Sequence, residues 1–197
     1  MMRSFLAVLI TVLALYGCGN SDSVDGDKLF NQGEYQLAIE AYDEYLSSQP
    51  KHIKSLYNRG RAYEELGNYK KAIEDYSAVL DIDKKNVQAN LSIGIDAFRN
   101  NDPDKALYHF GQSVSADPDN FKALILRGRA FHRLGNFESA RKDFDAAIRI
   151  NKEAGEAYFY RGIIYLESNK RKACVDFRKA SNLGVKDADK AQKRYCN

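Results

Sequence analysis

The sequence has almost no excess charge and lacks the motifs that mark an enzyme or a metal site. Its 30 Lys and Arg stand against 27 Asp and Glu without a long basic run, which argues against nucleic-acid binding. No G-x-S-x-G, P-loop, G-x-G-x-x-G, C-x-x-C or H-x-x-x-H motif occurs, and the three histidines share no spacing. We therefore expect neither catalysis nor a cofactor.

The sequence also lacks an apolar run long enough to cross a bilayer, which takes about 20 residues. The uncharged, mostly apolar run over 5–16 is shorter and follows Arg3, a pattern typical of a secretory signal peptide, which we place at 1–17. The run ends in Leu15-Tyr16-Gly17-Cys18, which resembles the lipobox of bacterial lipoproteins, although Tyr16 is bulkier than the usual residue. The alternative is an ordinary signal peptide followed by an incidental cysteine.

The lipobox resemblance implies that Cys18 carries the lipid and becomes the new N-terminus. It implies a location in the bacterial cell envelope, with a membrane anchor at Cys18 and a short polar tether that we place at 18–25. Gly19, where an aspartate would favour retention in the inner membrane, favours the outer membrane, with the chain facing the periplasm.

Cys174 and Cys196 are the two cysteines that remain, and an even pair in an exported chain is a candidate disulfide. A bridge closing a loop of this length would stabilise the fold by about 3 kcal/mol. The alternative is two separately buried thiols, because spacing alone does not establish connectivity.

An internal repeat dominates the rest of the chain. Glycines recur every 34 residues, accompanied by an alanine and an aromatic residue in each copy. A fixed period of this size predicts a solenoid, in which each unit packs only on its neighbours. The glycines are Gly26, Gly60, Gly94, Gly128 and Gly162; the aromatic residues are Tyr42, Tyr76, Phe110, Phe144 and Phe177.

Each copy is predicted to form two helices, best seen in 53–65 and 69–81. The segment LYNRGRAYEELGNYKKAIEDYSAVLDID resembles the tetratricopeptide repeat (TPR), and LILRGRAFHRLGNFESARKDFDAAIRI repeats it. The resemblance implies an all-α TPR solenoid of about five helix-turn-helix repeats over 26–184. A C-terminal capping helix would follow within 185–197, over 186–195.

The copies differ in ways that predict local structure. In the first copy the first helix is expected to be short, at 24–32. In the third, Asn101 replaces the turn glycine and Asp102-Pro103 should start the next helix. The fifth lacks one residue in its turn. The glycine is expected to let the paired helices approach closely, with the aromatic residue beside the contact.

In TPR proteins the first helices line a concave groove, and here their groove face is aliphatic and aromatic with basic flanks. Such a surface is typical of binding sites, although a neighbouring helix could bury some of its members. The predicted groove residues are Lys54, Tyr57, Asn58, Arg61, Leu91, Ile95, Lys122, Ile125, Arg129, Phe159, Tyr160 and Ile163.

Two further patterns bear on the groove. Only Asn58 matches the five-residue carboxylate clamp of co-chaperone TPR domains, so a chaperone partner is not expected. Arg59, Arg127 and Arg161 each precede a repeat glycine. They could form an anion ladder, but we favour packing between repeats with each guanidinium on a carboxylate or carbonyl.

The resemblance thus implies an envelope-anchored TPR scaffold that binds a protein segment in its groove. Envelope TPR lipoproteins act as adaptors in peptidoglycan-hydrolase control, outer-membrane protein assembly and pilus biogenesis. The alternative is a structural lipoprotein that self-associates as a homodimer through the same apolar stripe, without a peptide ligand.

Overall fold

The computed structural model describes residues 22–196, with side chains from Asp25 onward, and the regular elements in this range are helices. Most have 13 or 14 residues, and short connections separate them. They are α1 (Asp22–Asn31), α2 (Tyr35–Ser48), α3 (Ile53–Glu65), α4 (Tyr69–Ile82), α5 (Val87–Arg99), α6 (Pro103–Ala116), α7 (Phe121–Arg133), α8 (Phe137–Ile150), α9 (Gly155–Ser168), α10 (Lys170–Asn182) and α11 (Lys186–Tyr195).

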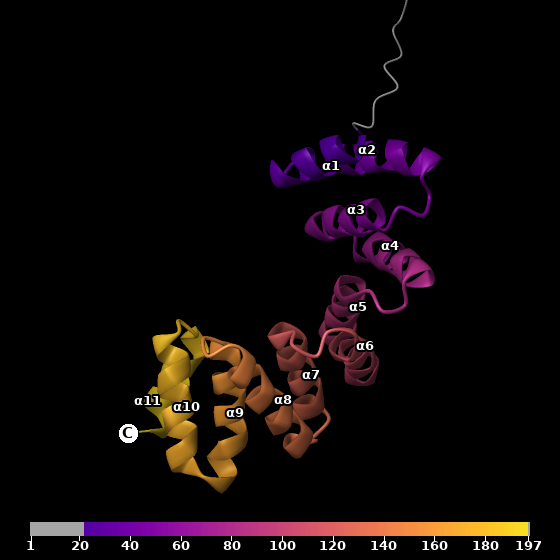
Figure 1. Ribbon diagram of the computed structural model, residues 1–197. Coiled ribbons are helices and arrows are strands. Elements are labelled where there is room, and N and C mark those ends of the chain that lie inside the picture. The colour runs from indigo at the N-terminus through magenta and orange to yellow at the C-terminus, as the bar shows by residue number, and fades with distance from the viewer. Residues whose placement is uncertain (1–21, 197) are drawn as a thin grey trace, which may run out of the picture.

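The helices pack in consecutive pairs, from α1 with α2 to α9 with α10, and α11 packs on α10. Figure 1 shows the pairs following one another along an arc, with α1–α2 at one end and α10–α11 at the other. The odd-numbered helices lie along the inner side of the arc, where α5 contacts α7 and α7 contacts α9. The predicted all-α solenoid of helical pairs is therefore confirmed.

Most predicted helix bounds agree with the structure, including those of α3 and α11, and α4 runs one residue further than predicted, to Ile82. The prediction for the first copy was less accurate, because α1 spans Asp22–Asn31 and begins inside the segment assigned to the tether. Acidic residues near a helix N-terminus are favoured by the helix dipole, and the sequence supplies Asp22 and Asp25 there.

The turns inside the repeats follow the predicted chemistry. Gly67 and Gly135 adopt positive φ after α3 and α7, and Asn101 takes the same role in the third repeat with φ of 60°. The Asp102 side chain accepts a hydrogen bond from the Lys105 N–H and so caps α6. In the fifth repeat Asn169 alone separates α9 from α10, which accounts for the missing residue.

The repeat glycines face the aromatic rings of their own repeats. A Cβ placed on Gly128 would lie 2.7 Å from Phe144 Cε1, and each of the other four repeat glycines has an aromatic carbon within 2.7 Å of the same position. All five rings are buried. The glycine therefore makes room for a ring, which is more specific than the close helix approach that the sequence predicted.

Replacing Gly128 with Ala should destabilise the fold by about 1–3 kcal/mol, because the new methyl overlaps the Phe144 ring. The matched control is Gly111→Ala in α6, where a Cβ meets nothing within 4 Å. That change should stabilise by about 0.5–1 kcal/mol, since alanine favours the helix. Urea unfolding followed by circular dichroism measures both, and equal effects at the two positions would contradict this packing role.

Candidate functional site

The first helices of the pairs form the inner face of the arc, and three hollows open along them. The first lies between α3 and α5, the second between α7 and α9, and the third between α9 and α11. Seven of the twelve predicted residues line them: Lys54, Tyr57, Lys122, Ile125, Arg129, Phe159 and Ile163.

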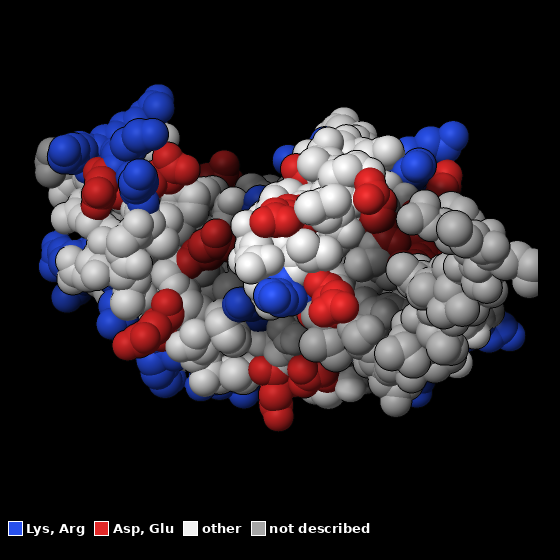
Figure 2. All heavy atoms as spheres, turned by 90° about the horizontal axis from the view of Figure 1, so that it is seen from above, with Lys and Arg blue, Asp and Glu red and all other residues white. Residues whose placement is uncertain are grey.

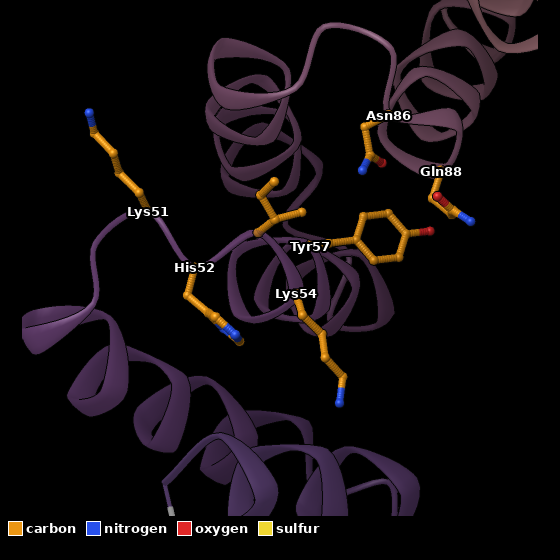
Figure 3. Close-up of a pocket in the computed structure, with 7 residues that line it drawn as sticks. Lys51, His52, Lys54, Tyr57, Asn86 and Gln88 are labelled. Carbon is orange, nitrogen blue, oxygen red and sulfur yellow. The ribbon is translucent and has the colours of Figure 1, made fainter. Parts of the chain in front are cut away.

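The first hollow, of about 530 Å³, is mainly polar at its edges (Figure 3). Tyr57 extends from α3 towards the start of α5, where Asn86 and Gln88 lie, and Lys54 points towards the first repeat. The Tyr57 ring also packs against Tyr76, with centroids 5.4 Å apart. This hollow therefore offers the Tyr57 ring together with His52, Ile53 and several amide and ammonium groups.

The Asp27 carboxylate binds polar side chains next to this hollow, including Lys54 and Asn58. Asp27 accepts hydrogen bonds from Asn58 Nδ2 and the Tyr42 hydroxyl, both at 2.7 Å, and Lys54 Nζ lies 2.5 Å from its other oxygen. Burial raises the pKa of Asp27, but the hydrogen bonds from Lys54, Tyr42 and Asn58 outweigh it and leave that pKa below its usual value. Asn58 is therefore already paired within the chain.

The second hollow, of about 450 Å³, has an apolar floor and a charged rim. Phe121, Ile125 and Leu126 line it together with Lys122 and Arg129 from α7, and Glu153 and Glu156 flank the start of α9. Ile125 is only 5% exposed and belongs to the core, so it forms the floor and is not the accessible anchor that the sequence predicted. The reason is its position, one helical turn before Gly128 and on the same face.

Arg129 connects this hollow to an aromatic cluster. Its guanidinium carbon lies 5.3 Å from the Phe98 ring centroid and 5.1 Å from that of Tyr160, and Arg133 lies 4.0 Å from Phe98. The Tyr160 ring stacks on Phe144 at 5.8 Å. Such cation–π contacts orient Arg129 while leaving guanidinium donors for a ligand.

The third hollow, of about 340 Å³, is the most apolar, with Phe159, Ile163, Leu166 and Phe177 on one side. Helix α11 forms its other wall, and Lys190 and Arg194 stand at the rim. A disulfide joins Cys174 of α10 to Cys196, with Cα atoms 5.5 Å apart, and so holds the end of α11 beside α10. The terminal helix is therefore part of the groove as well as a cap.

The remaining predicted residues contribute less. Arg61 lies over the Phe30 ring at 4.3 Å, and Leu91 packs against the core. Ile95 is 41% exposed on α5. The prediction missed residues that the next repeat or the terminal helix brings to the hollows, such as Gln88 of α5, Glu153 before α9 and Arg194 of α11, because it considered only one helix face at a time.

The arginines before the repeat glycines form ion pairs, as the favoured interpretation predicted. Arg127 binds Asp143 through two N–H groups, at 2.8 and 2.7 Å. Arg59 and Arg161 make the same paired contact with Asp75 and Asp176. Arg59 also reaches Asp43 of the preceding repeat, and Arg161 likewise reaches Asp145. Two of the three arginines therefore tie neighbouring repeats together.

The histidines have local structural roles. His52 caps α3 by accepting from the Ser55 N–H, and His109 hydrogen-bonds the buried Asn90 at 3.0 Å. His132 packs edge-on against Phe137. Within residues 22–196 no group of three His, Cys, Asp or Glu side chains is placed to hold a metal ion.

The repeat geometry agrees with the comparisons with known proteins. The tetratricopeptide repeat profile matches residues 26–87, 91–154 and 133–173, most of the chain, so the chain belongs to the TPR family. Tetratricopeptide repeat protein 6 of Homo sapiens is 28% identical over 157 residues, 78% of this chain and 30% of that protein. Hsp70-Hsp90 organizing protein 1 of Glycine max is 28% identical over 99 residues, 50% of this chain and 17% of that protein. The chain thus spans less than a third of either relative.

Solved structures show the same fold. The crystal structure of MamA has a TM-score of 0.72 at 24% identity and covers 83% of this chain and 96% of its own. YrrB has a TM-score of 0.73 at 20% identity and covers 87% of this chain and 90% of its own. At these identities the likeness concerns the fold alone.

Asp27→Asn should destabilise the first repeat by about 1–2 kcal/mol at neutral pH, because it removes a charge that accepts three hydrogen bonds. The folded pKa of Asp27 lies below its unfolded value, so this stabilisation is present above the unfolded pKa and lost as pH falls through the folded pKa. The difference between variant and native chain should therefore shrink as the pH falls below the ordinary pKa of an aspartate, about 3.9.

Thermal unfolding at several pH values measures this effect. Asp25→Asn, an exposed change in the same helix, is the control and should alter stability by no more than about 0.5 kcal/mol. A loss for Asp27→Asn that is independent of pH would contradict the role of its charge.

Proposed function

We propose that this TPR protein is a scaffold that binds a protein segment in its concave groove, chiefly in the second and third hollows. The observation that carries this proposal is the apolar floor of these hollows, formed by Phe121, Phe159 and Ile163 beneath a charged rim. Aromatic and Arg side chains around an apolar pocket are the residues that most often anchor protein interfaces.

The same geometry defines the ligand in chemical terms. Alternating apolar floors and charged rims suit a segment that inserts hydrophobic side chains into successive hollows. Lys122, Arg129 and Arg194 at the rims would favour acidic groups beside them, and Glu153 and Glu156 would favour basic groups near the start of α9. YrrB, described as a TPR protein with an unusual peptide-binding site, supports this class of function.

We also propose that the scaffold is anchored in the bacterial cell envelope through a lipid on Cys18, and that it faces the periplasm from the outer membrane. Cys18 lies outside the described residues, and the support is the lipobox-like sequence together with Cys174 and Cys196, whose disulfide suits an oxidising compartment. Envelope assembly and control of peptidoglycan enzymes are the roles that this location favours. In the described part of the chain, no helix is long and apolar enough to cross a membrane.

Self-association through the groove stripe is the weaker alternative. It requires an accessible apolar strip along the first helices, but Ile125 is buried and Leu91 packs in the core. The accessible apolar surface is divided into separate hollows, which suits a narrow segment better than a second solenoid.

Peptides selected from a random display library on the full, oxidised chain should bind in the groove. Arg129→Ala or Phe159→Ala should weaken them about 30-fold, because hot-spot residues cost about 2 kcal/mol when truncated. Lys105→Ala, an exposed change on α6, is the control and should leave affinity unchanged. Isothermal titration measures these affinities, and selected peptides that bind both groove variants at native affinity would refute the groove assignment.

Cys18→Ala should release the protein from membranes in a bacterial host and abolish metabolic labelling with an alkyne fatty acid. A chain with Cys174→Ser and Cys196→Ser keeps Cys18 and should stay labelled and membrane-bound. Fractionation and gel fluorescence give both readouts. Equal labelling of the Cys18→Ala chain would show that the lipid is elsewhere or absent.

A further inference from the structure

Charge is strongly polarised along the solenoid. The first repeat, residues 22–50, has one Lys or Arg against seven Asp and Glu, whereas residues 170–196 have nine against three. Figure 2 shows Lys and Arg gathered at the left, on the side where α10 and α11 lie in Figure 1. A nearly neutral chain therefore has one strongly acidic end and one strongly basic end.

The acidic end presents a defined patch on α2, the helix of the first repeat that lies outside the arc. Leu37, Glu40 and Glu44 are spaced by three and four residues, so they share one face of the helix. All three are exposed, and Leu37 is 49% exposed at one end of the patch. The Glu40 carboxylate accepts a hydrogen bond from Gln36 Nε2 at 3.2 Å, but within the described range neither glutamate forms an ion pair, so neither charge is neutralised by a cation of its own chain.

The basic end presents the complementary patch on α10. Arg171, Val175 and Arg178 are spaced by four and three residues, with Lys179 beside them. Val175 is 60% exposed, and the three basic side chains are exposed as well. None of these three forms an ion pair to any residue in 22–196. Each patch thus combines an exposed aliphatic residue with charges of one sign.

One chain cannot bring the two patches together, because α2 and α10 lie at opposite ends of the arc. A second copy can, since each copy offers both partners. We propose that the acidic patch of one copy (Leu37, Glu40 and Glu44) docks on the basic patch of another (Arg171, Val175, Arg178 and Lys179).

This contact differs from the groove in place and in chemistry. It lies on outer helices of the pairs and leaves the hollows between α7, α9 and α11 open for a ligand. Its attraction is electrostatic and exposed, so it should be sensitive to salt, since the Debye length is about 8 Å at about 0.15 M. Self-association should therefore be strong in low salt and weak in high salt.

Sedimentation velocity of the full chain in density-matched non-ionic detergent tests this proposal. Glu40→Lys with Glu44→Lys, or Arg171→Glu with Arg178→Glu, should each weaken self-association at least about tenfold, because each places like charges opposite one another. Lys70→Glu with Lys84→Glu is the matched control for the arginine pair, since it makes the same charge change at exposed sites in the second repeat and at its end, and it should have no effect.

The decisive measurement mixes the two reversed variants. One variant now has two basic patches and the other has two acidic patches, so an equal mixture should associate although neither variant does so alone. A closed dimer and a longer chain both support the proposal, because both use the same pair of patches. A native chain that remains monomeric in low salt, or a mixture that fails to associate, would overturn it. Circular dichroism of each variant checks that the fold is intact.

Discussion

The fit of an aromatic ring against a glycine is the contact on which the rest of the structure depends. It occurs once in each of the five helical pairs and fixes how the two helices rotate against each other. Because Gly128 must face Phe144, Ile125 on the same face of α7 is drawn into the core, while Lys122 and Arg129 reach the inner side of the arc. The core contact therefore also determines which residues a ligand can meet.

This constraint explains how the groove floor differs between repeats. In the second and fifth repeats the residue three positions before the repeat glycine borders the aromatic ring: the Tyr57 and Tyr76 ring centroids lie 5.4 Å apart, and those of Phe159 and Phe177 lie 6.0 Å apart. A large aromatic side chain at this position packs against the core ring and still extends into the groove. An aliphatic one, such as Ile125, is too short to do both and stays at the bottom of a hollow.

The period made the helix bounds and turns predictable, because Gly67, Asn101 and Asn169 act through local backbone geometry. What could not be predicted depends on contacts between repeats. The Asp27 network joins three helices of two repeats, and the depth of Ile125 depends on its neighbours. The early start of α1 at Asp22 was not predicted, because the first copy departs from the repeat pattern.

The contacts that line the groove differ between its N-terminal and C-terminal halves, and this argues that the two halves have different roles. In the first half, Asp27 pairs with Lys54 and accepts a hydrogen bond from Asn58, so these two groove residues already have a partner within the chain. The third repeat has Ile93 and His109 at the positions where other repeats have the Arg–Asp pair. Arg161 ties α8, α9 and α10 together in the second half as Arg59 ties α2, α3 and α4 in the first, and the second half adds a disulfide that holds the end of α11 beside α10. A rigid wall loses less entropy when a ligand binds, so the hollows between α7 and α11 are the better preorganised part of the groove.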